Sequence, residues 1–345
     1  IHPLRCDGVQ IRGVSIINHT RGPNTDGIDP DSSRNVTISD CYIEAGDDCI
    51  VIKTTGRLGG KTPPSENITV SNCVLTTTCN NIKLGTESLC DFRSIAVTNC
   101  TMFRTPGAFQ PPISGLAIEM VDGSVLDGLV ISNITMRDVR TPIFIRLGNR
   151  GRGQAIPTPG KLRNVSISNV TATGALLANS ITGLPGHPVQ EVSLADINVT
   201  MKGGVKEFRG LEVPEYPDKY PEATMFGTLP AYGFYARHVE GLRMRNVRLR
   251  WEEPDLRPAM IFDDVKRLDL DGFEAATVAG DLPILWFHQV SHALLRGARS
   301  APGAALFLRV SGAGTEAVRV LASDLSGAKQ DVEVSPEVGK TAVTK

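Results

Sequence analysis

Two short acidic motifs contain the residues of this chain that are best suited to catalysis. An Asn-Thr-Asp-Gly motif occupies residues 24–27 and a Gly-Asp-Asp-Cys motif occupies residues 46–49, so that Asp47 follows Asp26 by 21 residues. Acetal hydrolysis needs one carboxyl group that keeps its proton for the leaving oxygen and another that stays ionised to activate water. Crowded carboxylates divide these tasks, because ionised neighbours raise the pKa of at least one of them. We therefore predict a site for glycosidic bond hydrolysis at Asp26, Asp47 and Asp48.

A repeating fold would bring these motifs onto neighbouring turns, and the sequence contains such a repeat. Similar phrases of alternating apolar and polar residues lie at 36–41, 68–73, 95–100, 129–134, 165–170 and 192–197, with looser copies at 242–247 and 268–273. Further strand-like segments lie between them, at 50–53, 82–84, 116–120 and 143–147. Alternation with period two, bounded by Gly, Asn or Asp, is typical of strands with one buried face. Two or more short strands per repeat predict an all-β parallel β-helix whose turns stack about 4.8 Å apart.

Stacking of the copies also places residues of one type in columns. The two clearest columns consist of Cys41, Cys73 and Cys100, and of Asn72, Asn99, Asn133 and Asn169. We expect the cysteines to be small buried side chains rather than disulfide partners. The asparagines are expected to pair with one another and with backbone groups at a turn, which gives them a structural role.

The repeat predicts a single domain over residues 1–345, with a polar tail from about residue 327. The chain begins in strand-like sequence at 9–16 without an amphipathic helix before it, so we expect the N-terminal cap of the solenoid to be missing. Long loops at 54–66, 149–160 and 203–232 interrupt the repeat, and such insertions tend to wall a groove on one side of a solenoid.

Composition limits the possible partners. The chain has 36 basic and 37 acidic residues and a net charge of −1, so no overall field attracts it to nucleic acid or to a membrane surface. No apolar run approaches the roughly 18 residues that span a bilayer. The seven cysteines are odd in number and lack a zinc-like C-x2-C pair, so they do not settle the redox compartment.

The order and spacing of the two acidic motifs, together with the Val-Thr-Ile repeats around them, resemble glycoside hydrolase family 28, the polygalacturonase and rhamnogalacturonase group. The similarity extends from about residue 9 to residue 280. It implies a right-handed parallel β-helix, hydrolysis of pectic polysaccharide by a single displacement with inversion, and no cofactor or metal. Carried over to the matching positions, it makes Asp47 the general acid, while Asp26 and Asp48 activate the water.

Two motifs of that family differ in this chain. Where polygalacturonases carry Gly-His-Gly, residues 79–81 are Cys-Asn-Asn, so Asn80 replaces the usual histidine. Where they carry Arg-Ile-Lys, which is associated with gripping the uronate carboxylate, residues 117–119 are Ala-Ile-Glu. A carboxylate at Glu119 repels a galacturonate acid group unless it is paired. A backbone of alternating rhamnose and galacturonate is therefore as good a candidate substrate as plain polygalacturonate.

Basic residues near these positions can compensate for the missing pair. Lys53 and Arg146 share an outward column with Glu119, and Lys83 lies on the alternate column one turn after the acids. A guanidinium group can donate two parallel hydrogen bonds to a carboxylate. We expect Lys53, Asn80, Lys83, Glu119 and Arg146 to contact the substrate. The alternative is that the four charged residues form a surface charge ladder.

Two other functions remain open at this point. A polysaccharide lyase on a similar helix would remove a proton from uronate with a lysine or arginine base and with Ca²⁺ bridging carboxylates. A glycan-binding solenoid without catalysis would use the same acids only as turn caps. Because a polymer must be met where it lies, we expect the protein outside the cytoplasm, secreted or periplasmic, with its signal segment not in this chain. The sequence leaves the oligomeric state open.

Overall fold

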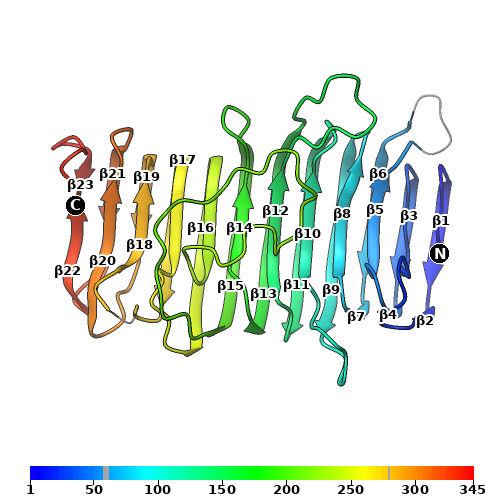
Figure 1. Cartoon of the computed structure of the whole chain (residues 1–345), viewed down its shortest axis with the longest axis horizontal. Helices are drawn as coiled ribbons and strands as arrows, with labels where there is room; N and C mark the ends of the chain where they lie inside the picture. The colour runs from blue at the N-terminus through cyan, green and yellow to red at the C-terminus, as the bar shows by residue number, and fades with distance from the viewer. Residues whose placement is uncertain (57–61, 279) are drawn as a thin grey trace.

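The computed structural model describes residues 1–56, 62–278 and 280–345, and its strands stack into a long parallel solenoid (Figure 1). Every pairing between its named strands is parallel, and consecutive turns are in register. The predicted all-β parallel β-helix is therefore confirmed. None of the described residues forms a helix long and apolar enough to cross a membrane.

Three stacks of strands make up the solenoid. The first sheet consists of β5 (Ile50–Thr54), β8 (Asn80–Ser88), β10 (Ser114–Met120), β12 (Thr141–Leu147), β14 (Asn179–Thr182), the beginnings of β16 (Phe234–Glu253) and β17 (Met260–Ala275), β18 (Pro283–His288), β20 (Ala304–Ser311) and β22 (Ala328–Val334). The second consists of β1 (Asp7–Arg12), β3 (Arg34–Ser39), β6 (Ser65–Ser71), β9 (Phe92–Phe103), β11 (Val125–Arg137), β13 (Lys161–Ala175), β15 (Val189–Gly203), the remainder of β16 and β17, β19 (Ser291–Arg296), β21 (Glu316–Leu321) and β23 (Val343–Thr344). A short third stack consists of β2 (Ser15–Ile17), β4 (Tyr42–Ala45) and β7 (Val74–Thr77), which continues onto the end of β9. The polar tail thus adds β22 and β23 to the solenoid.

The core is a column of aliphatic side chains, as the alternating phrases predicted. Register pairs Val36 with Ile68, Ile68 with Ile95, and Ile95 with Leu129, and all four are buried. Each turn therefore covers the apolar face of the previous one, which is the main source of stability in a solenoid. The predicted thiol column lies in this core, where Cys41, Cys73 and Cys100 are buried and free.

The predicted asparagine column forms a hydrogen-bonded ladder at the bend between the second and third stacks. Amide donors link Asn99 to Asn72, Asn133 to Asn99 and Asn169 to Asn133, at 3.3, 3.0 and 3.1 Å. Each of these residues has a positive φ, between 53° and 56°, a backbone conformation that asparagine tolerates better than most residues. The column therefore fixes the bend of the chain at each turn.

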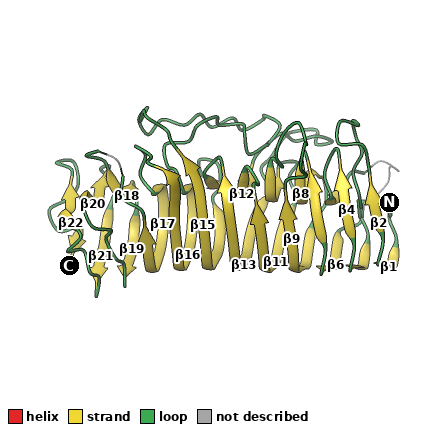
Figure 2. Cartoon of the chain, turned by 90° about the horizontal axis from the view of Figure 1, so that it is seen from below, coloured by secondary structure: helices red, strands yellow, loops and turns green. Residues whose placement is uncertain are grey.

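Long connections leave the solenoid mainly on one side, as Figure 2 shows. The expected loop at 54–66 includes residues 57–61, which lie outside the described residues. The longest connection between named strands joins β15 to β16 and includes residues 204–233; it crosses in front of several stacked strands in Figure 1. We call residues 203–232, the loop expected from the sequence, the crossing segment.

Candidate active site

The two acidic motifs lie on adjacent turns: residues 46–49 immediately precede β5 of the first sheet, and residues 24–27 immediately precede Ile28, which bridges to β5. Ile28 bridges Ile50 in parallel, and Ile50 pairs with Ile82 in β8. Two residues earlier, the same register aligns Asp26, Asp48 and Asn80 on three consecutive turns. Backbone hydrogen bonds hold this alignment, from Gly27 N to Asp48 O and from Cys49 N to Asn80 O, both at 2.9 Å.

Asp47 and Asp48 lie side by side but have different surroundings. Asp47 is half-buried and accepts a hydrogen bond from the Asp48 backbone N–H at 2.9 Å. Asp48 is buried, and its Oδ1 accepts from the Asn80 Nδ2 at 2.9 Å and from the Asn80 backbone N–H at 3.1 Å. The Lys83 ammonium lies 3.1 Å from Asp48 Oδ2. Asn80, the replacement for the family histidine, therefore binds a carboxylate of the site.

These surroundings move the two pKa values in opposite directions. Burial raises the pKa of Asp47, and the charges of Asp48 and Asp26 raise it further. Burial also acts to raise the pKa of Asp48, but the Lys83 ammonium and the hydrogen bonds from Asn80 outweigh it, so the Asp48 pKa lies below its usual value. Asp47 thus retains its proton to higher pH than Asp48 does.

Asp26 is joined to Lys53 and to a carboxyl group that the sequence analysis did not select. The Lys53 Nζ lies 2.8 Å from Asp26 Oδ2 and 3.0 Å from Asp29 Oδ2. Burial raises the pKa of Asp29 to about 7, where Lys53 opposes the shift and the Asp26 charge adds to it. The single positive charge of Lys53 therefore lies between the carboxyl groups of Asp26 and Asp29 and can neutralise only one negative charge.

A model described as "Glycosyl hydrolases family 28" matches residues 3–215, which are 213 of the 345 residues. The chain belongs to glycosyl hydrolase family 28. Its relatives include a "Probable polygalacturonase" of Vitis vinifera, 22% identical over 67% of this chain and 50% of that relative. An "Exopolygalacturonase" of Platanus acerifolia is 27% identical over 59% of this chain and 52% of that relative. The chain spans about half the length of these relatives.

A solved structure supports the fold. The crystal structure of a hyperthermoactive exopolygalacturonase from Thermotoga maritima matches with a TM-score of 0.53 and 24% identity, over 72% of this chain and 49% of that one. At this identity the likeness shows a shared fold. The family 28 resemblance and the β-helix expected from the acidic motifs and repeats are both confirmed.

Glu119, at the position of the family 28 lysine, is fully buried. Among the described residues, neither of its carboxyl oxygens has a hydrogen-bond partner, and Lys83 Nζ is 3.7 Å from Oε2. Burial raises the Glu119 pKa to about 8, although the Lys83 charge acts in the opposite direction. Lys83 therefore lies between one carboxyl group that is held ionised and one that is held neutral at pH 7.

Arg146 shares the outward column with Glu119, as predicted, but it is covered by the crossing segment. Its guanidinium group donates to the backbone oxygens of Gly183, Glu215 and Tyr216, and it is 1% exposed. The side chains of Lys53 and Lys83 are also mostly buried, with exposures of 14% and 3%. The four charged residues are therefore not the surface charge ladder considered as the alternative.

The crossing segment also brings two residues to the site that the sequence analysis missed. Tyr220 places its hydroxyl 3.3 Å from Lys83 Nζ. Burial raises the pKa of Glu222 to about 6, with Lys83 opposing and the charges of Asp48 and Asp47 adding to the shift. The only signal for either residue was the length of the predicted loop, because the residues between 203 and 232 have no strand period.

The sulfur of Cys79 and carboxylate oxygens of Asp47 and Asp48 also lie within 4.8 Å of one another, a spacing that suits metal ligands.

Proposed function

We propose that this chain hydrolyses glycosidic bonds in pectic polysaccharide with inversion, using Asp47 as general acid and Asp26 and Asp48 to activate the water. The observation that carries this proposal is the pair of adjacent carboxyl groups whose pKa values are moved in opposite directions. Hydrolysis of an acetal requires this division, because one group must donate a proton while another stays ionised.

In the proposed reaction, a water oxygen attacks the anomeric carbon while the bond from that carbon to the leaving oxygen breaks. Asp47 donates its proton to the leaving oxygen, and a carboxylate of Asp48 or Asp26 takes a proton from the water. The new hydroxyl group forms on the face opposite to the leaving group, which inverts the anomeric configuration. The base then releases its proton to solvent and Asp47 takes one up from solvent, so that both groups are restored and the net reaction adds one water.

Lys53, Asn80 and Lys83 support this chemistry by holding carboxylates. Lys83 and Asn80 contact both oxygens of Asp48 and keep it ionised. Lys53 forms an ion pair with Asp26 at 2.8 Å and so fixes the position of that carboxyl group. We propose that these three are positioning residues, and that Glu119 and Arg146 lie out of reach of the substrate, contrary to the expectation from the sequence, because both are fully buried.

Pectic polymer is the proposed substrate, and an extracellular or periplasmic location follows from its size. Relatives named polygalacturonase and exopolygalacturonase support a galacturonate-containing chain. Where the family carries lysine, this chain has the buried Glu119, which supplies no positive charge for a uronate and so weakens the case for a uronate at every subsite. A polymer of alternating rhamnose and galacturonate and plain polygalacturonate therefore both belong in the assay.

Asp47→Asn tests the proposal. The amide cannot donate an acidic proton, so kcat should fall at least about a hundredfold, the usual size of general acid catalysis. Asp218→Asn, an exposed position in the crossing segment, is the matched control and should keep native activity. Proton NMR of the first product would report the anomeric configuration. Full activity of Asp47→Asn on the true substrate, or retention of configuration, would refute the proposal.

The lyase alternative has less support. A lysine base must be neutral, but the pKa values of Lys53 and Lys83 are both raised, because their neighbouring carboxylates outweigh the effect of burial. Lyase products absorb in the ultraviolet through a new conjugated double bond, whereas hydrolysis yields only new reducing ends. Glycan binding without turnover after long incubation would instead indicate a binding module.

A further inference from the structure

The outer surface of the first sheet is covered on one side of the aspartates. Outward-pointing side chains of a β-helix are exposed unless another part of the chain packs on them. After Asp48, the outward positions of successive turns include Lys83, Glu119, Arg146 and Tyr235, and all four are at most 3% exposed. The crossing segment is the part of the chain that covers the last two.

Close contacts fix the crossing segment to this surface. Arg146 Nη2 donates to Glu215 O at 2.6 Å, and Asn149 N donates to Pro217 O, also at 2.6 Å. The Glu215 carboxylate accepts from His238 Nε2 at 3.1 Å and pairs with Arg237. The space among Arg146, Phe226, Tyr235 and the backbone around them is too small for a water molecule. A polysaccharide therefore cannot lie along this part of the sheet.

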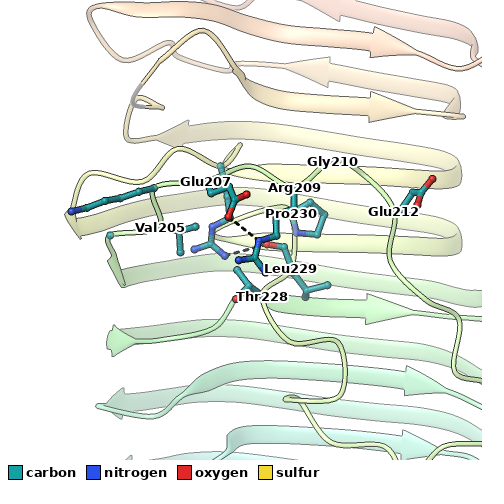
Figure 3. Close-up of a pocket in the computed structure, with 11 residues that line it drawn as sticks. Val205, Glu207, Arg209, Gly210, Glu212, Thr228, Leu229 and Pro230 are labelled. Carbon is teal, nitrogen blue, oxygen red and sulfur yellow. Dashed lines mark hydrogen bonds and ion pairs between the residues drawn. The ribbon is translucent and has the colours of Figure 1, made fainter.

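Cavities remain between the crossing segment and the solenoid, one of about 660 Å³ beside Val213, Glu215 and Arg237, and another at the two ends of the segment. A cavity of about 350 Å³ lies there, lined by residues that include Val205, Leu229 and Arg257 (Figure 3). Its Arg209 pairs with Glu207 at 3.0 Å, and Arg257 donates to Leu229 O at 3.2 Å. This cavity is at the level of β16 and β17, whereas the aspartates precede β5, so it is separate from the proposed chemistry.

The edge of the covered surface coincides with the reactive carboxyl groups. Tyr220 is 47% exposed, although its neighbour in space, Lys83, is buried. Two cations make cation–π contacts with the Tyr220 ring: Lys83 Nζ lies 5.6 Å and the Arg150 guanidinium carbon 5.7 Å from the ring centroid. Because Lys83 Nζ is also 3.1 Å from Asp48 Oδ2, one side chain links the ring to the site. The ring is thus held in place while part of it faces solvent.

We propose that the crossing segment ends the substrate-binding surface beside Asp48, and that Tyr220 is the wall against which the terminal sugar of a pectic chain stacks. The C–H face of a sugar ring is apolar, and an aromatic ring offers it a large contact area with little loss of side-chain freedom. A surface that is closed at one end admits a chain end next to Asp47, so the enzyme removes short units from that end. This inference rests on the proposed hydrolysis. Tyr220 lies beyond residues 3–215, which match the family, so the family match does not account for it.

The product pattern of the full chain tests the closed end. Polygalacturonate and a rhamnose-containing pectic backbone are each incubated with the protein, and viscosity and new reducing ends are followed together. Release from chain ends leaves the viscosity nearly unchanged while short products appear from the first time point. A rapid fall in viscosity at few new reducing ends would overturn the inference and leave the proposed hydrolysis standing. Absence of hydrolysis on every pectic polymer would refute both.

Binding to Tyr220 is measured separately from turnover. In the Asp47→Asn background, calorimetry with short pectic oligosaccharides should show about tenfold weaker binding for Tyr220→Ala, the size expected for loss of one aromatic contact. Tyr220→Phe keeps the ring and should restore the affinity to within about twofold. Lys219→Ala, the exposed neighbour in the chain, is the control and should bind normally. Equal affinities of the Tyr220→Ala and control proteins would overturn the role of Tyr220.

Discussion

Two columns of polar side chains run along this solenoid, and the same stacking produces opposite results in them. In the asparagine column, Asn72, Asn99, Asn133 and Asn169 bond to one another at 3.0 to 3.3 Å. An amide group has both donors and an acceptor, so identical residues pair along the column, and its first member, Asn72, donates to Asp40 on the preceding turn at 3.1 Å. The column satisfies itself and therefore contributes to stability.

The acidic column cannot satisfy itself. Ionised carboxylates only accept hydrogen bonds and repel each other, so stacking Asp26 over Asp48 requires positive charge from nearby positions. Lys53 and Lys83 supply it at 2.8 and 3.1 Å. The comparison indicates that a self-complementary stack contributes to stability by itself, whereas stacked carboxylates depend on cations from neighbouring positions. Asp47, which lies beside the acidic column without such a cation among the described contacts, has a raised pKa.

Removal of Lys83 should break the acidic column most severely. Lys83→Met leaves the ionised Asp48 buried without its counter-charge, and loss of one partner of a buried ion pair costs about 3 to 5 kcal/mol. Urea denaturation would measure this loss. The control is Lys202→Met, whose exposed ion pair with Glu252 at 2.7 Å should contribute less than about 1 kcal/mol. Equal losses of unfolding free energy in the two variants would contradict the claim that the acidic column depends on Lys83.

A second test uses the pH dependence of Glu119. Its pKa is about 8 in the folded chain and about 4.5 when unfolded, so the folded state holds more protons between these values. The contribution of Glu119 to the stability of the folded chain therefore decreases as pH rises from about 4.5 to about 8 and is lost above. Glu119→Gln removes only the Glu119 part of the pH dependence, because Asp29 and Glu222 still titrate in this range. The unfolding free energy of the variant, taken relative to that of the native chain, should therefore be about 1 to 3 kcal/mol higher at pH 8 than at pH 5.

Unfolding of both proteins at the two pH values would measure this difference, with Glu316→Gln as an exposed control. The control should follow the native chain at both values. If Glu119→Gln also follows the native chain, Glu119 is ionised throughout, and Lys83 balances two carboxylates rather than one.

The columns themselves could be predicted from the sequence because a short repeat has a local cause. Alternation and turn residues recur in each copy, so Asn99 and Cys73 could be assigned to their columns without knowledge of any long-range contact. The same register aligned Asp26 with the second acidic motif. Asp29 was missed because an aspartate in a turn rich in Gly and Pro has a sufficient local explanation.

Contacts made by the crossing segment could not be predicted. Tyr220 meets Lys83 across 137 residues, and the segment between 203 and 232 has no period that fixes its direction. The outward direction of Arg146 was predicted correctly from alternation, but its burial depends on what this segment covers. The sequence therefore indicated where the carboxyl groups meet, and the three-dimensional structure was needed to find the surface that surrounds them.

The smallest expected effect separates backbone strain from hydrogen bonding in the asparagine column. Asn99 has a φ of 55°, so Asn99→Ala loses the side-chain bonds and also places alanine in the left-handed region, at a combined cost of about 2 kcal/mol. Asn99→Gly tolerates the same φ, so its cost of about 1 kcal/mol reports chiefly the lost bonds. Both variants should retain native kcat, since the column lies apart from the acids. If Asn99→Gly were as stable as the native chain in urea, the ladder bonds would add nothing, and stability along this edge would come from the apolar core alone.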